Sequence, residues 1–204
     1  QLMGEYDQRP WLGLYGELPT DLTPEHGNAL AMFEATLERA PDATLLHYFD
    51  ARLTAGEVEW IASGLAAGLT GLGVGRGDRV ALYLQNVPQF VLAMLAVWKA
   101  GAIVVLINPM YREREIAHLL NDSGAKVLIA LEQLYGDVAE TVTTETSVEA
   151  VVTTSPLDLL DGQLPAMLED LERVRHHGVH DLLELAAANT GAALPDPALE
   201  PNDI

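Results

Sequence analysis

The sequence contains no cysteine and few basic residues. Without cysteine the chain can form neither a disulfide framework nor a thiolate metal site, a composition that is compatible with a cytoplasmic protein. Eleven Lys and Arg residues stand against thirty Asp and Glu residues, which gives a formal net charge of −19. A field of this sign repels phosphate backbones and anionic membrane surfaces. We therefore expect no nucleic-acid partner and a cytoplasmic location, with at most peripheral membrane contact.

The chain also lacks an apolar run typical of a membrane span. Its most apolar stretch, residues 87–107, contains Pro88, Lys99 and Gly101, so it divides more naturally into a helix and a strand. We expect no transmembrane segment and no targeting signal within these residues. Because Gln1 is not an initiator residue, we expect the sequence to start inside a longer product.

Apolar residues make up 49% of the 204 residues, enough for one domain with a substantial core. We predict an irregular N-terminal arm over residues 1–27, an α/β subdomain over residues 28–155, and a variable tail of helices and loops over residues 156–204. The arm is rich in proline, glycine and aromatic residues, and we expect its aromatic side chains to anchor it on the surface. These are Tyr6, Trp11 and Tyr15.

Apolar periodicity predicts the elements of the central part. Residues 55–70 repeat apolar side chains every three or four positions, as in a helix buried along one side, and Thr54 can cap this helix. The other predicted helices lie between Asn28 and Pro41, from Pro88 to Gly101, and over 113–121 and 134–140; the predicted strands are 43–48, 52–53, 79–84, 103–107, 126–130 and 150–153. Strands separated by helices must run parallel, because a tight hairpin cannot connect them. The predicted fold class is α/β, with a mostly parallel sheet flanked by helices in βαβ units.

The pattern weakens after Ser155. Residues 164–175 and 179–188 are amphipathic and predict two helices separated by Gly178. A domain edge near residue 155 is one interpretation, and packing of the tail back onto the sheet is the other.

A glycine run at Gly71, Gly73, Gly75 and Gly77 is the first candidate for chemistry. Phosphate binding requires such glycines to follow a strand and to open a helix, so that the helix N-terminus faces the anion. Here the order is reversed, and the spacing is not G-x-G-x-x-G. We interpret the run as a helix stop followed by a turn.

Histidines and carboxylates supply two further candidates. His176, His177 and His180 include a pair four residues apart that could chelate a metal from one helix face, but Gly178 interrupts that helix. Paired carboxylates perform acid and base chemistry only when they converge in different environments. Exposed helix faces explain the acidic residues more simply. The carboxylates considered are Glu57, Glu59, Glu113, Glu115, Glu169, Asp170 and Glu172.

The fourth candidate is the segment Asn108-Pro109-Met110-Tyr111, which follows an apolar strand and precedes a helix. Open α/β sheets place ligands at the carboxyl ends of parallel strands. Asn-Pro is also an ordinary turn sequence. We name Asn108 and Tyr111 as candidate substrate-pocket residues.

Several linked motifs occur in one order: Gly77-Asp78-Arg79-Val80, Asn86 with Pro88 and Phe90, Lys99-Ala100-Gly101-Ala102, Asn108-Pro109, and Asn121-Asp122-Ser123-Gly124-Ala125. Together they resemble the N-terminal region of the adenylate-forming acyl-CoA synthetases of the AMP-binding superfamily, over roughly residues 30–130. The segment INPMYREREIAHLLNDSGAKVLI is most similar to bacterial long-chain and medium-chain fatty-acid–CoA ligases. Ala55 and Val58 depart from the family's usual Tyr and Leu.

The resemblance implies the N-terminal subdomain of the large domain of an enzyme that joins a fatty acid to ATP as acyl-AMP and transfers the acyl group to coenzyme A. Fatty acid, ATP, coenzyme A and Mg²⁺ are the implied ligands, and a homodimer is an implied assembly. The family's Thr/Ser/Gly phosphate-binding loop and its later motifs are absent from the 204 residues. We therefore assign no catalytic, cofactor-binding or metal residue, and we expect this piece alone to be inactive and to bind no cofactor.

Three alternatives remain open at this point. The first is a fatty-acyl-AMP ligase, which passes the acyl group to a carrier protein. The second is a non-catalytic acidic α/β interaction module. The third, a nicotinamide-binding Rossmann protein, is disfavoured by the order of the glycines.

Overall fold

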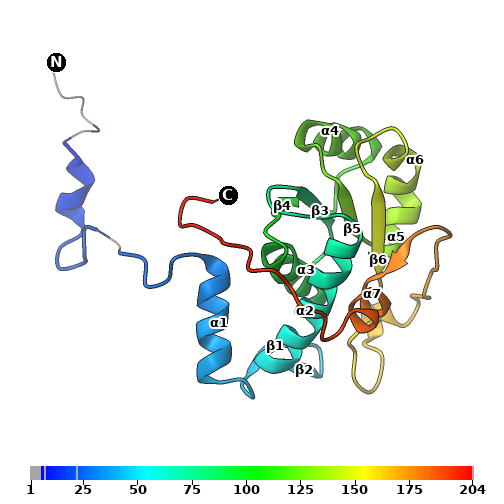
Figure 1. Cartoon of the computed structure of the whole chain (residues 1–204), viewed down its shortest axis with the longest axis horizontal. Helices are drawn as coiled ribbons and strands as arrows, with labels where there is room; N and C mark the ends of the chain where they lie inside the picture. The colour runs from blue at the N-terminus through cyan, green and yellow to red at the C-terminus, as the bar shows by residue number, and fades with distance from the viewer. Residues whose placement is uncertain (1–5, 7, 22, 204) are drawn as a thin grey trace.

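The computed structural model describes residues 6, 8–21 and 23–203. Its centre is a parallel sheet (Figure 1), which has five strands. The strands are β3 (Arg79–Tyr83), β4 (Ile103–Leu106), β5 (Val127–Leu131), β6 (Ala150–Thr154) and β7 (His180–Asp181), in the spatial order β4-β3-β5-β6-β7. Every neighbouring pair is parallel. The predicted α/β class, with a mostly parallel sheet flanked by helices, is confirmed.

Strand residues alternate between two buried faces. Val80, Leu82 and Ile129 pack on the side covered by α2 (Ala55–Gly71), α3 (Pro88–Lys99) and α7 (Leu182–Ala188). Their neighbours Ala81 and Leu128 point to the side covered by α4 (Glu113–Ser123) and by the helical segment α5 (Glu132–Leu134), η2 (Tyr135–Ala139, a π-helical turn) and α6 (Glu140–Thr143). Burial on both faces explains why these strands are almost continuously apolar in sequence.

A smaller layer lies beside this sheet. The antiparallel hairpin of β1 (Thr44–Tyr48) and β2 (Ala51–Thr54) and the helix α1 (Ala29–Arg39) share an apolar cluster with α2 and α3. The predicted caps are confirmed. Asn28 Oδ1 accepts a hydrogen bond from the Ala31 amide at 2.8 Å, and Thr54 forms a reciprocal capping box with Glu57. The hydrogen bonds that the Thr54 amide and hydroxyl donate to the Glu57 carboxylate hold the pKa of Glu57 below its ordinary value.

The amino end of the sheet is closed by cationic side chains that bind backbone carbonyls. Arg79 Nε donates to the Ser123 carbonyl at 2.7 Å, at the end of α4, and Lys126 Nζ donates to the Gly73 carbonyl at 2.6 Å. Gly73 and Gly77 have φ of +87° and +80°, as expected of the turn between α2 and β3. The glycine run therefore forms the turn between α2 and β3, as its position after a helix and before a strand indicates.

The expected anchoring of the N-terminal arm by its aromatics is wrong for the described residues. The arm contains a short 3₁₀ helix, η1 (Pro10–Leu14), with no buried residue, and it extends away from the sheet (Figure 1). Tyr6 and Trp11 lie against each other, with ring centroids 6.0 Å apart, rather than against the core. Contact between the two rings removes part of each ring from water, so neither ring has to insert into a pocket of the α/β domain. Residues 1–5, 7 and 22 lie outside the described residues.

The tail differs from its prediction in two places. Over residues 164–175 the structure has only one 3₁₀ turn, η3 (Ala166–Leu168), instead of a helix, and Met167 is 75% exposed. The prediction for residues 179–188 is half right, because Leu182–Ala188 is α7 but His180–Asp181 pairs with β6 as β7. Pairing with β6 thus overrides helical periodicity at this position, and residues beyond 155 complete the sheet.

Candidate binding site at the carboxyl ends of the strands

The carboxyl ends of the parallel strands open into a pocket of about 910 Å³. Its walls come from the turn of the β1–β2 hairpin, from the loops that follow β3, β4 and β6, and from residues near η3. The lining includes Tyr48, Phe49, Leu84, Asn86, Phe90, Leu106, Asn108, Pro109, Tyr111, Pro156 and Met167. This end of an open α/β sheet is where such folds bind ligands.

The wall of this pocket is mostly apolar and partly solvent-exposed. Leu106 is 59% exposed at the end of the edge strand β4, and Phe49 is exposed in the hairpin turn. Met110, in the loop after β4 but outside the pocket lining, is 81% exposed. Exposed apolar side chains gathered around a hollow are typical of surfaces that receive an apolar ligand or a neighbouring segment. The opposite end of the sheet has cation–carbonyl contacts instead.

Both candidate pocket residues from the sequence line this hollow. Asn108 Oδ1 accepts a hydrogen bond from the Met110 amide, and the Asn108 carbonyl accepts one from the Tyr111 amide, each at 2.9 Å. These bonds make residues 108–111 a tight turn between β4 and α4. The side-chain oxygen of Asn108 is thereby used by the turn. Contact of either residue with a substrate stays a prediction.

Two tyrosines that the sequence analysis missed, Tyr48 in the pocket lining and Tyr83 outside it, donate hydrogen bonds to backbone carbonyls of pocket-lining residues. Tyr48 Oη donates to the Pro156 carbonyl at 2.8 Å, and Tyr83 Oη donates to the Tyr111 carbonyl at 2.8 Å. Burial raises the pKa of both phenols, because it removes water from the phenolate form. Tyr83 ends an apolar strand, and a buried phenol there requires an acceptor. That requirement was the available signal in the sequence.

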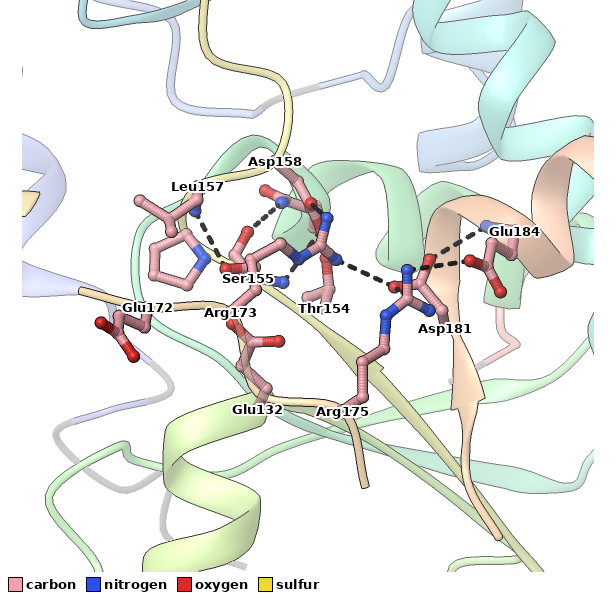
Figure 2. Close-up of polar contacts among 12 residues, drawn as sticks. Glu132, Thr154, Ser155, Leu157, Asp158, Glu172, Arg173, Arg175, Asp181 and Glu184 are labelled. Atoms are coloured by element: carbon pink, nitrogen blue, oxygen red, sulfur yellow. Dashed lines mark hydrogen bonds and ion pairs between the residues drawn. The ribbon is translucent and has the colours of Figure 1, made fainter. Parts of the chain in front are cut away.

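A charged network lies where β6 ends (Figure 2). Asp158, whose side chain is 2% exposed, accepts hydrogen bonds from Thr154 Oγ1 at 2.8 Å and from the Ser155 amide at 2.9 Å. Its other oxygen lies 2.6 Å from Arg173 Nη1, and Arg173 Nη2 lies 3.0 Å from Asp181 Oδ2. Asp181 also caps α7 through the Glu184 amide. Because Asp158 is fully paired, we interpret it as a structural clamp on the tail.

The remaining candidates do not converge on this pocket. The described part of the chain contains no group of three or more His, Asp or Glu side chains placed to hold a metal ion. His176 Nε2 lies 2.8 Å from the Glu132 carbonyl, and its ring contacts Tyr135 edge-on. Gly136 leaves the space for that ring, since a Cβ there would lie 2.7 Å from His176 Cε1. His176 therefore packs the tail against the π-helical turn.

A helix long and apolar enough to cross a membrane is not found among the described residues.

The fold is that of an open parallel α/β domain, a class in which ligand sites lie at the carboxyl ends of the strands, where this chain has its pocket. The family described as "AMP-binding enzyme" matches residues 33–204, and the chain belongs to this family. The resemblance seen in the sequence motifs is thus confirmed.

The chain is also similar in sequence to curated CoA ligases. The chain is 35% identical over 156 residues to a long-chain-fatty-acid–CoA ligase of Escherichia coli O6:H1, an alignment that covers 75% of this chain and 28% of that protein. It is 34% identical over 154 residues to the long-chain-fatty-acid–CoA ligase of Bacillus subtilis, covering 75% of this chain and 27% of the relative. The chain therefore spans less than a third of the length of these relatives.

Solved structures share the fold. A benzoate CoA ligase from Burkholderia xenovorans LB400 superposes with a TM-score of 0.69 at 22% identity, covering 86% of this chain and 31% of that one. A long-chain-fatty-acid-CoA ligase from Archaeoglobus fulgidus superposes with a TM-score of 0.64 at 24% identity, covering 91% and 33%. The architecture is that of adenylate-forming CoA ligase domains.

Three buried or half-buried tyrosines predict loss of stability at alkaline pH. The pKa values of Tyr48, Tyr83 and Tyr135 are raised, chiefly by burial. A folded-state pKa above the unfolded value contributes stability that is fully present below about pH 10 and is lost as pH rises through the folded pKa. We expect the free energy of unfolding to fall above about pH 10, measured by urea unfolding at several pH values. Tyrosinate absorbance should then appear in two steps, and a single step at the ordinary tyrosine pKa would contradict the expectation.

Proposed function

We propose that the full-length protein is a fatty-acid–CoA ligase. The observation that carries the proposal is the similarity to bacterial long-chain-fatty-acid–CoA ligases at 34–35% identity over three quarters of the chain. In the proposed reaction a fatty-acid carboxylate oxygen attacks the α-phosphorus of ATP, and pyrophosphate leaves. The coenzyme A thiol then attacks the acyl carbonyl, loses its proton and releases AMP.

The described residues contribute a wall of the acyl pocket in this proposal. The hollow at the strand ends is lined by Phe49, Leu106 and Met167, which suit an alkyl chain because each removes apolar surface from water on contact. Asn108 and Tyr111 lie on the same wall, in the loop after the edge strand β4, and we propose that they contact the acyl chain. Mg²⁺ would offset phosphate charge during adenylation. The described carboxylates form no ligand cluster for it, so we derive no metal-dependent step from them.

The test begins with the coding sequence downstream of residue 204, followed by an assay of the complete product for pyrophosphate release. We expect release that depends on a fatty acid, and consumption of the acyl-adenylate that depends on coenzyme A. The matched control is the 204-residue chain, which we expect to release no pyrophosphate because it has no Thr/Ser/Gly phosphate-binding loop.

Each alternative has its own outcome in this assay. Pyrophosphate release with transfer to a carrier protein but not to coenzyme A would indicate a fatty-acyl-AMP ligase. No release with any of a panel of fatty acids, from a complete product without a phosphate-binding loop, would leave a non-catalytic α/β module. A homodimer and a cytoplasmic location remain proposals, to be examined by light scattering and by cell fractionation.

A further inference from the structure

The hydroxyl of Tyr83 connects the buried sheet to the loop at the wall of the pocket. Tyr83 is the last residue of β3, and its ring is fully buried in the cluster formed with α4. Its Oη lies 2.8 Å from the Tyr111 carbonyl oxygen and 3.5 Å from that of Pro109. A phenol has one proton to donate, so the shorter contact is the hydrogen bond.

The loop's other hydrogen bonds shape it without fastening it to the sheet. The Met110 and Tyr111 amides both donate to Asn108, inside the same turn. The loop begins just after the Ile107 amide, which donates to the Leu82 carbonyl at 3.0 Å. From residue 108 onward, the Tyr83 hydroxyl supplies a connection to a different element. If the loop moved away, it would leave a phenol in a buried site without its acceptor, which is unfavourable.

We propose that Tyr83 is a positioning residue for the pocket. Its hydroxyl holds the Tyr111 carbonyl and thereby fixes the side chains of Asn108 and Tyr111 on the pocket wall. The inference rests on the proposed function, since binding of an acyl chain by this pocket is itself proposed. Tyr83 does not line the pocket, so it acts through Tyr111 and not by contact with the ligand.

The test compares Tyr83→Phe with Tyr135→Phe in the 204-residue chain. Both changes remove one hydroxyl from a largely buried tyrosine on the same face of the sheet, and Tyr135 does not line the pocket. Hydrogen exchange at the Met110 and Tyr111 amides is the first measurement, and the dissociation constant for dodecanoate is the second. We expect exchange at both amides about tenfold faster in Tyr83→Phe, the effect of one lost hydrogen bond, and dodecanoate binding about fivefold weaker. Tyr135→Phe should change neither.

The outcomes separate this inference from the proposed function. Unchanged exchange at the two amides in Tyr83→Phe, or equal acceleration in both variants, would overturn the positioning role. Faster exchange confined to Tyr83→Phe, in a chain that binds no dodecanoate, would support the positioning role and count against the proposed acyl pocket. Local exchange distinguishes the two variants even where their overall stabilities fall equally.

Discussion

Replacement of Gly64 by alanine is expected to lower the free energy of unfolding by about 2–3 kcal/mol, the cost of overpacking two helices. Gly64 lies in α2, where a Cβ would come 2.3 Å from the carbonyl oxygen of Ala186 in α7. The obstructing atom belongs to the backbone, so no rotamer change can relieve the clash. Alanine is the better helix former by about 1 kcal/mol, which offsets only part of the cost.

Urea unfolding followed by circular dichroism measures this effect, and Gly71→Ala is the matched control. Gly71 is the last residue of the same helix, and a Cβ there would meet no atom within 4 Å. We expect Gly71→Ala to be neutral or to stabilise by less than about 1 kcal/mol. Gly68→Ala should fall between the two, because its Cβ would meet the movable side chain of Leu185. Equal stability of Gly64→Ala and the parent chain would refute the close packing of α2 on α7.

Replacement of Arg173 by methionine is expected to lower the free energy of unfolding by about 2–3 kcal/mol, because it removes the cation from a buried carboxylate. Arg173 joins Asp158, in the loop that follows β6, to Asp181, the N-cap residue of α7 (Figure 2). Without the guanidinium, Asp158 retains the Thr154 hydroxyl and the Ser155 amide but no positive charge. Methionine keeps an apolar stem, so the change isolates the loss of the charged group.

Arg175→Met is the matched control, since it changes the net charge equally. Arg175 is 59% exposed; it pairs with the exposed Glu184 at 2.9 Å and at a longer distance, 3.5 Å, with Asp181, and it does not pair with Asp158. Exposed pairs contribute little, and we expect a loss below about 1 kcal/mol. The double variant Arg173→Met, Asp158→Asn should recover part of the lost stability, because a neutral amide at 158 can still accept the Thr154 and Ser155 hydrogen bonds. No difference between the two arginine variants would show that the Asp158 pair does not hold the tail.

Much of the local structure could be predicted from sequence, for a physical reason. Asn28 and Thr54 cap helices through bonds that reach only three residues along the chain, and Pro88 begins α3 because its missing amide costs nothing at a first helical turn. Apolar runs separated by helices required parallel strands. The position of Asn108 and Tyr111 at a strand's carboxyl end followed from the same order of elements.

The tertiary structure alone decided the features that depend on distant segments. The pocket is assembled from loops after β3, β4 and β6, so its lining depends on the strand order, which no local pattern encodes. The strand His180–Asp181 that pairs with β6 has only two residues, so its sequence cannot be distinguished from the helical pattern that follows it. The partner of Asp158 lies fifteen positions away at Arg173, and the sequence does not show whether Arg173 or the neighbouring Arg175 reaches it. The amino-acid sequence thus determined the family and the elements up to residue 155, through linked motifs and interactions within a few residues. The fold decided which side chains meet, because those contacts form only when separate elements pack.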